Sequence, residues 1–200
     1  MQDLQGLINV VKKLPGIGGK TAKKIAIHLA INKAKCQSLI TNLESVNQNT
    51  TECKMCHNIA SIANENICEI CSNTKRDFAK ICIVEGIEDL EIIESCGDYQ
   101  GLYHILGGSI SFSERILPES LNIKSLISRL STNKIEEIIF ANNATINGKI
   151  TMSYVQNLIK EQKMYIQQSE ISIGVPIGAS VNFLDSATMS AAIKHRRQVS

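Results

Sequence analysis

The 200-residue sequence lacks a long apolar run, so no part of it is typical of a helix that spans a bilayer. Its first residues, Met1 to Leu4, also lack the cationic and apolar regions of a secretory signal peptide. Both absences favour a cytoplasmic protein without a membrane partner. The length leaves room for one large domain or two small ones, and the hydrophobic content of 44% is ordinary for a globular chain.

Acidic residues are scarce near the N-terminus. Residues 1–43 contain seven lysines and one acid, Asp3, which gives a net charge of +6. Because the whole chain carries +2, residues 44–200 carry −4. A basic helical end on a nearly neutral chain indicates a local site for a polyanion, although lysines on a solvated helix face are also common.

A complete Walker loop is missing as well, although residues 18–21, Gly-Gly-Lys-Thr, resemble the end of one. Such a loop needs a glycine five positions before the glycine of Gly-Lys-Thr, and Leu14 stands there. Residues 3–13 and 22–29 instead have the apolar spacing of two amphipathic helices, with Pro15 and glycines between them. An ATP site is therefore not expected.

The expected helical hairpin has the chemistry of a phosphate-binding site. Glycine-rich backbone at a helix start presents free N–H groups and the positive end of the helix dipole to an anion. Ile17, between the glycines, is expected to turn inward and hold the helices together. Residues 14–26 resemble the helix-hairpin-helix motif, which binds the DNA backbone without reading its sequence. The alternative is a hairpin that only packs. The predicted DNA-binding residues are Lys12, Lys13, Gly16, Gly18, Gly19, Lys20, Lys23 and Lys24.

Seven cysteines, an odd number, argue against a disulfide framework in a reducing compartment and favour metal ligation. Cys53 with Cys56, and Cys68 with Cys71, form two C-x-x-C pairs with the spacing of a tetrahedral zinc site. We predict one structural Zn²⁺ per chain, because four thiolates leave no open position for water. His57 lies beside a ligand and is not needed in the set. The cysteines expected to be small buried hydrophobes are Cys36, Cys82 and Cys96.

From residue 80 onward, apolar runs typical of buried strands alternate with helical spacing. The predicted strands are residues 81–84, 102–106 and 138–141, the predicted helices are residues 89–96, 121–130 and 151–160, and residues 164–166 and 171–175 are candidates for further strands. This alternation predicts βαβ units on a mainly parallel sheet, with functional residues beyond the carboxyl ends of the strands.

The first strand of this region is followed by Glu85 and, four residues later, by Asp89. The arrangement resembles a Toprim domain, in which a glutamate and an Asp-x-Asp pair hold magnesium. The two aspartate positions carry Asn143 and Thr145 here, and Lys149 adds a positive charge, so the anionic oxygens that magnesium prefers are missing. Glu85 and Asp89 form either a weak cation site or a solvated acid pair, and metal-dependent phosphoryl transfer is not expected.

The order of helix-hairpin-helix, four-cysteine site and Toprim-like region resembles the RecR family of bacterial recombination mediators over nearly the whole chain. Residues 83–85, 101–108, 138–143 and 174–178 add to the resemblance. It implies an α+β multidomain fold. The implied domains are a helix-hairpin-helix DNA-binding domain at 1–51, a zinc finger at 52–78, a Toprim-like α/β domain at 79–168 and a C-terminal strand and helix at 169–200.

The resemblance further implies a DNA-repair protein without enzymatic activity that binds single- and double-stranded DNA regardless of sequence. It implies homodimers or ring-like homotetramers, and it implies RecO and RecF as partners in loading RecA onto gaps coated by single-strand-binding protein. The implied partner-binding residues on the Toprim face are Glu85, Asp89, Asn143 and Asn147. Residues 111–115, residues 147–149 and Glu170 depart from the family pattern and change the charge of that face.

Residues 181–185 resemble the apolar run and aspartate of a Walker B strand, which the family also shows. Without a Walker loop the run cannot complete an ATPase. Asp185 is expected to cap a helix over residues 187–194, and the apolar run is expected to pair with the sheet or with a neighbouring subunit. Residues 194–197 are either a solvated tail or a secondary phosphate contact.

Two other functions stay open. The alternative that follows from the Toprim resemblance is a metal-dependent nuclease or primase-like enzyme, which would need acids where Asn143, Thr145 and Asn147 stand. The third hypothesis is a zinc module that scaffolds proteins without touching DNA, and it predicts no salt-dependent DNA binding.

Overall fold

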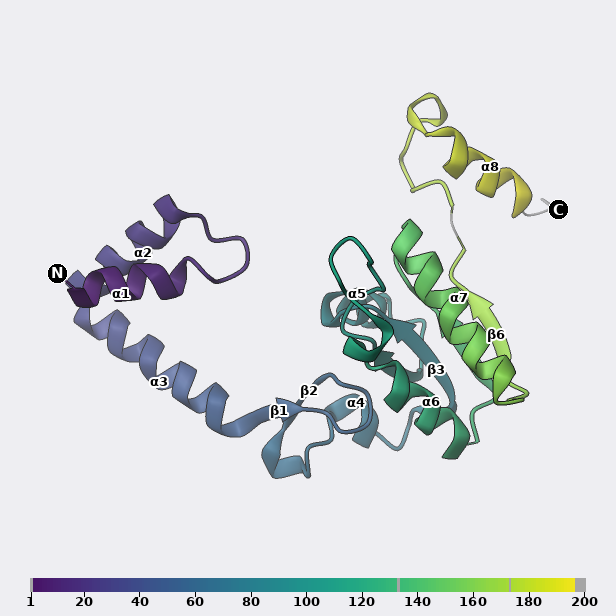
Figure 1. The fold of residues 1–200 in the computed structure, drawn as a ribbon, viewed down its shortest axis with the longest axis horizontal. Coiled ribbons are helices and arrows are strands. Elements are labelled where there is room, and N and C mark those ends of the chain that lie inside the picture. Colours follow the sequence, from purple (N-terminus) through teal and green to yellow (C-terminus); the bar gives the residue numbers. More distant parts are fainter. Residues whose placement is uncertain (1, 133, 173, 197–200) are drawn as a thin grey trace. The chain divides into compact units, whose positions relative to one another are not determined.

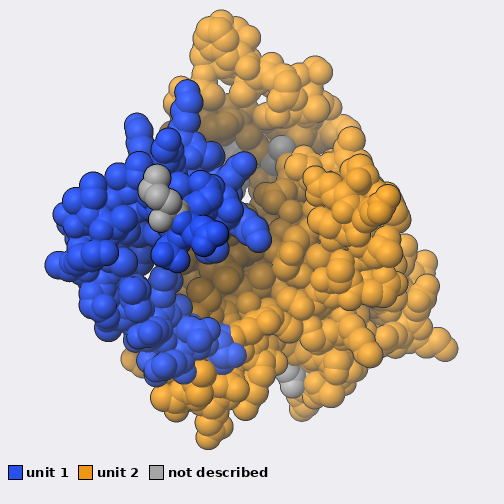
Figure 2. All heavy atoms as spheres, turned by 60° about the vertical axis from the view of Figure 1, so that its left-hand side comes forward, with its two compact units in different colours: residues 1–51 blue, residues 52–200 orange. Residues whose placement is uncertain are grey.

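The computed structural model describes residues 2–132, 134–172 and 174–196. The chain divides into two compact units, residues 1–51 and residues 52–200 (Figure 2). The first unit is helical, and the second contains the cysteine pairs and the main sheet. In the described residues, no helix is both long enough and apolar enough to cross a membrane.

The first unit consists of α1 (Gln2–Val11), α2 (Gly19–Ile31) and α3 (Lys33–Asn49) (Figure 1). The apolar spacing that predicts α1 and α2 also packs them, since Val11, Ala22, Ala26 and Leu29 are buried. Their connecting turn needs Gly16, whose φ of +74° is one that L side chains rarely adopt, and Ile17 is half-buried there. α3 is not among the helices predicted from the sequence, and none of its residues is buried.

A short module follows, with little apolar core of its own. Its elements are β1 (Thr50–Glu52), β2 (Ile59–Ser61), the 3-10 helix η1 (Ile62–Asn64) and α4 (Glu69–Ser72), and β1 and β2 form a two-stranded sheet. The buried residues of this module's cluster are Ala60 and the four paired cysteines. The four cysteines therefore make up most of the buried part of this module.

Four parallel strands form the main sheet, in the order β4-β3-β5-β6. The strands are β3 (Asp77–Val84), β4 (Gly101–Ile105), β5 (Glu137–Phe140) and β6 (Gln167–Glu170), and the connecting helices are α5 (Ile87–Cys96), η2 (Pro118–Ser120), α6 (Ile123–Thr132) and α7 (Ile146–Glu161). The predicted parallel sheet with alternating helices is confirmed.

Both faces of this sheet are buried, which explains the continuous apolar run that predicts β3. Ile81 and Ile83 belong to the core that includes residues of α6 and α7, whereas Cys82 and Val84 belong to the core that includes Leu90 of α5. Successive residues of β3 thus serve opposite faces. Burial raises the pKa of the Cys82 thiol to about 12, so this cysteine remains a neutral apolar group.

The fourth strand lies where neither candidate segment placed it, so the prediction of strands at 164–166 and 171–175 is wrong. β6 runs between these segments, and Ile173 lies outside the described residues. Its sequence, Gln-Gln-Ser-Glu, is polar because an edge strand is held by backbone pairing with β5 and needs few apolar side chains. Met164 and Ile166 instead pack against the core beside α6 and α7.

Two cysteine predictions also need correction. Cys82 is buried as predicted, but Cys36 is only half-buried on α3, and Cys96 at the end of α5 is exposed. Cys96 precedes Gly97, the left-handed C-cap of α5, and helix ends lie at the surface. Spacing alone does not distinguish a cysteine that faces a core from one at an exposed terminus.

The C-terminal region contains the 3-10 helix η3 (Val181–Phe183) and α8 (Ser186–Lys194). Asp185 accepts a hydrogen bond from the Thr188 N–H at 2.9 Å, which confirms the predicted cap. Pairing of residues 181–184 with the sheet is wrong for this chain, because they form no strand and Phe183 is 85% exposed. Their pairing with another subunit stays a prediction. Residues 194–196 are exposed, and Arg197 lies outside the described residues.

Candidate functional sites

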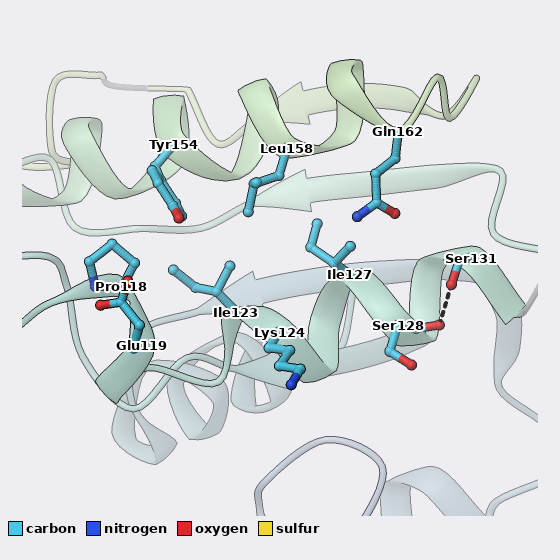
Figure 3. A pocket seen from close by; sticks show the side chains of 10 residues that line it. All are labelled: Pro118, Glu119, Ile123, Lys124, Ile127, Ser128, Ser131, Tyr154, Leu158 and Gln162. Carbon is cyan, nitrogen blue, oxygen red and sulfur yellow. Dashed lines mark hydrogen bonds between the residues drawn. The ribbon is translucent and has the colours of Figure 1, made fainter.

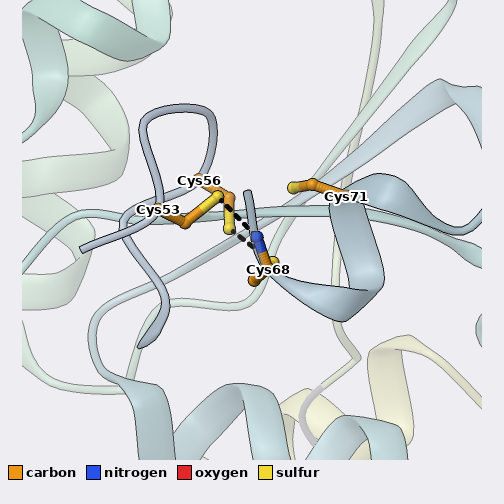
Figure 4. Close-up of side chains that lie close together, drawn as sticks. All are labelled: Cys53, Cys56, Cys68 and Cys71. Carbon is orange, nitrogen blue, oxygen red and sulfur yellow. Dashed lines mark hydrogen bonds between the residues drawn. The ribbon is translucent and has the colours of Figure 1, made fainter. Parts of the chain in front are cut away.

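The four paired cysteines come together in the second unit. Their sulfur atoms all lie within 4.8 Å of one another, and all four residues are buried (Figure 4). Cys53 and Cys56 lie in the turn after β1, Cys68 is the N-cap of α4, and Cys71 lies within α4. Four sulfurs around one zinc ion at about 2.3 Å would be about 3.8 Å apart, so the cluster fits a tetrahedral metal ion.

The cluster is also electrostatically prepared for a cation. Hydrogen bonds from Cys56 and Cys71 lower the pKa of Cys68, while the hydrogen bond to Cys68 raises the pKa of Cys56, with burial adding to the rise. One thiolate therefore forms readily, whereas further negative charge is opposed. The Cys68 N–H also lies 3.3 Å from the Cys53 sulfur, which it can stabilise as a thiolate. A bound dication would remove the opposition to the remaining charges.

His57 is engaged outside the cluster. Its Nδ1 lies 2.5 Å from Oε1 of Glu52, and its Nε2 lies 2.7 Å from Oγ of Ser125 on α6. Both ring nitrogens therefore have partners other than a metal. The φ of His57 is +67°, and its N–H donates to the Cys53 carbonyl at 2.9 Å, so the residue closes the turn that places two sulfurs.

The predicted DNA-binding residues occupy the turn after α1 and the start of α2. All of them are exposed, and none of the five lysines takes part in an ion pair among the described residues. Gly18 is the extended N-cap of α2 and supplies no side-chain cap, so the first backbone N–H groups of α2 stay available to an anion. A Cβ on Gly16 or Gly18 would meet nothing within 4 Å, so the turn is open to solvent.

At the carboxyl edge of the main sheet, Glu85 is buried, with only 8% of its surface exposed. Its Oε2 accepts a hydrogen bond from Nδ2 of Asn143 at 2.7 Å, and its Oε1 accepts one from the backbone N–H of Asn143 at 3.0 Å. Nδ2 of Asn142, a residue that is not among the predicted site residues, lies 3.4 Å from Oε1. Glu85 is therefore held by amides, and the hypothesis of a solvated acid pair is wrong for this residue.

Three of the four predicted partner-binding residues share one cavity. Glu85, Asp89 and Asn143 line a hollow of about 580 Å³ together with Glu52 and Glu88. Asp89 also accepts the Gly86 N–H at 2.9 Å and so fixes the start of α5. Asn147 lies in the first turn of α7 and does not line this hollow. The edge therefore presents several carboxylates to solvent.

A separate groove of about 710 Å³ lies between α6 and α7 (Figure 3). Its apolar side chains are Ile123, Ile127, Tyr154 and Leu158, with Pro118 at one end, and polar residues such as Lys124 and Gln162 lie at its rim. None of the predicted site residues lines it.

The close approach of α7 to the Glu85 edge depends on Gly148. A Cβ there would lie 2.1 Å from the Asn143 carbonyl oxygen and 3.0 Å from Oε1 of Glu85. We expect Gly148→Ala to lower the free energy of unfolding by about 1–3 kcal/mol, because the loop that holds Glu85 must move. Urea unfolding measures this change. Gly174→Ala is the control, since its Cβ would meet nothing within 4 Å, and equal losses in both variants would contradict the steric account.

The chain is similar to known proteins along nearly its whole length. A family model for the Toprim domain matches residues 79–170, and one for the C-terminal region of RecR matches residues 174–197. The recombination protein RecR of Rickettsia massiliae is 38% identical over 196 residues, which are 98% of this chain and 95% of that protein. RecR of Rickettsia canadensis is 37% identical over 98% of this chain and 96% of that protein. RecR of Flavobacterium johnsoniae is 37% identical over 96% of this chain and 92% of that protein. The chain belongs to the RecR family of recombination proteins.

Proposed function

We propose that this chain is a non-enzymatic recombination mediator in DNA repair that grips the DNA backbone with the hairpin of α1 and α2. The observation that carries the proposal is the exposed set of five lysines beside an uncapped, glycine-rich helix start, with none of the lysines in an ion pair among the described residues. Phosphates satisfy both features, since they accept hydrogen bonds from backbone N–H groups and release counterions when lysines neutralise them. Such contacts ignore base sequence, so single- and double-stranded DNA both serve as ligands.

The carboxyl edge of the main sheet is the proposed site for protein partners. Its proposed contact residues are Glu85, Asp89, Asn143 and Asn147. Four carboxylates line the hollow beside it and favour a partner with a basic surface. The relatives are named recombination proteins, and we propose RecO and RecF as the partners, acting to load RecA at gaps coated by single-strand-binding protein. The assembly that encircles DNA would be a homodimer or a homotetramer.

The four-cysteine cluster is proposed to hold one Zn²⁺ per chain. Four thiolates form a closed, soft ligand set that suits zinc and leaves no coordination position for water. Zinc in such a site contributes free energy to folding and takes no part in a reaction. Its task would be to hold the turn after β1 and the start of α4 together.

A Toprim-type nuclease or primase-like enzyme is the rival function, and the contacts of Glu85 disfavour it. Asn143 stands at a position where the Toprim pattern has an aspartate, and it donates two hydrogen bonds to Glu85. A neutral amide satisfies the glutamate without any cation, whereas two facing carboxylates would need one. A scaffold that does not bind DNA is the third function. The open hairpin speaks against it, because its exposed lysines form no ion pair within the part of the chain that the structure describes.

DNA affinity is expected to fall steeply with salt, and the hairpin lysines are expected to set the slope. Each phosphate contact contributes about one unit to the slope of log affinity against log salt, so Lys20→Ala and Lys23→Ala should each lower its magnitude by roughly one. Fluorescence anisotropy on a labelled oligonucleotide across a salt series measures this. Lys160→Ala, an exposed lysine of α7, is the control. A slope that the hairpin substitutions leave unchanged would favour the scaffold.

No DNA cleavage is expected with Mg²⁺ or Mn²⁺, because both carboxylate oxygens of Glu85 already accept hydrogen bonds from amide groups of Asn143. The measurement is a gel assay on single- and double-stranded DNA with each metal. Glu85→Gln is compared with Glu88→Gln, an exposed glutamate two residues into α5. Cleavage that disappears only in Glu85→Gln would establish the enzyme and overturn the mediator.

Purified protein is expected to contain one Zn²⁺ per chain, and Cys56→Ser is expected to lose it. Since metal-binding free energy contributes to folding in such modules, the variant should also unfold several kcal/mol more easily. Elemental analysis and thermal unfolding are the measurements. Cys96→Ser, at the exposed end of α5, should keep both metal and stability. Full stability of Cys56→Ser would contradict a structural metal.

A further inference from the structure

Arg129 of α6 carries a buried charge that the functions above do not use. Only 7% of its surface is exposed, and no carboxylate lies within 4.0 Å of its nitrogens in the part of the chain that the structure describes. Its Nε and Nη2 are buried and have no hydrogen-bond partner among those residues. An isolated cation is among the least favourable groups to bury, so Arg129 calls for a counter-charge.

The hydrogen bonds of Arg129 lead to the cysteine turn. Its Nη1 donates to the carbonyl oxygen of Met55 at 3.1 Å and to that of Tyr103 on β4 at 2.7 Å. Met55 lies between two of the clustered cysteines, and the carbonyl of the adjoining Cys56 accepts the N–H of Ile105 at 2.9 Å. The guanidinium therefore holds the peptide that carries the first sulfur pair against the main sheet.

Among residues 2–132, 134–172 and 174–196, no other ionisable group pairs with Arg129 as a counter-charge. His104 of β4 is neutral, since burial, with the nearby charge of Arg129 contributing, lowers its pKa to about 3. The hydroxyl of Tyr103 donates to Glu94 at 2.6 Å, and Glu94 is paired with Arg76. Glu94 thus belongs to the opposite, α5-covered face of the sheet and is already paired with another arginine.

A metal-loaded cluster would supply the missing charge. Four thiolates carry −4, so a bound Zn²⁺ leaves a buried centre of −2, which itself needs a nearby cation. We propose that Arg129 is the counter-cation of the loaded cysteine cluster and couples metal binding to the stability of the Toprim-like domain. The inference rests on the metal site of the proposed function. The sequence gives one signal of it, an arginine between Leu126 and Leu130 on the apolar stripe of α6.

A purely structural role for Arg129 would need only its two hydrogen bonds to carbonyls. Arg129→Gln and Arg129→Lys separate the two roles, because the glutamine amide offers two N–H donors without charge and the lysine ammonium offers donors with charge. Positioning groups around metal ligands typically change metal affinity by 10–100-fold. We therefore expect Arg129→Gln to bind zinc at least tenfold more weakly than wild type, and Arg129→Lys to stay within about threefold.

The experiment is competition between the folded full-length protein and a chromophoric chelator for Zn²⁺, with Co²⁺ absorption as a second readout of four-sulfur ligation. Coupling is reciprocal, so zinc should also raise the unfolding midpoint of Arg129→Gln less than that of wild type. Arg76→Met is the control, because it removes a half-buried arginine that pairs with Glu94, and its zinc affinity should match wild type.

Each outcome bears on one proposal. Wild-type protein without metal would remove the zinc site itself. Wild type with one zinc ion and an Arg129→Gln variant of equal affinity would leave the zinc site standing and overturn the role of Arg129. If Arg129→Gln does not fold even with zinc, Arg129→Lys decides, and a loss of tenfold or more in that variant would overturn the proposal.

Discussion

The constraint on which the second unit depends is the crowding of four cysteine sulfurs within 4.8 Å of one another. Neutral thiols gain little from such proximity, and four thiolates would repel one another, so a bound cation would stabilise the arrangement. The surrounding module adds Ala60 and little else to its own core. Its position comes from neighbours: Ile70 packs against this cluster and against both cores of the main sheet. Sulfur chemistry closes the module, and apolar contacts with the sheet place it.

The edge of the main sheet lies within the stretch that matches the Toprim family model, and amide groups hold its two turns together. The chain turns at Glu85 and again at Asn143, and the two turns are joined by hydrogen bonds from amide to carboxylate. The same two turns with a pair of facing acids would repel until a metal ion bridged them. Because Asn143 donates both hydrogen bonds to Glu85, the two turns hold together without a bridging cation. The outer carboxylates of the edge are then available to bind other groups. Function thus follows from the residues at the edge and not from the fold.

Periodicity predicts most of this fold, and composition predicts the cysteine cluster. The strands buried on both faces are apolar throughout, so β3, β4 and β5 are visible in the sequence, as are the helices that cover them. β6 is not, because backbone pairing at a sheet edge leaves no apolar pattern in Gln-Gln-Ser-Glu. α7 starts at Ile146 because Thr145 caps it, a local contact that apolar spacing does not report. The partners of Glu85 and Arg129 join residues far apart in the chain, so only three-dimensional structure reveals them.

The bond from Arg129 to Met55 spans 74 residues, and that from His57 to Ser125 spans 68. During translation, the cysteine turns are synthesised well before α6, the helix that anchors them. For an interval the cysteines are therefore present without Arg129 and Ser125, which later hold their turn. Parallel strands with helical crossovers lengthen this interval, since β4 and α6 must both be complete before the anchor forms. The order of synthesis therefore exposes the four thiols first and the residues that bury them second. Oxidation of these thiols during that interval would block assembly of the cluster.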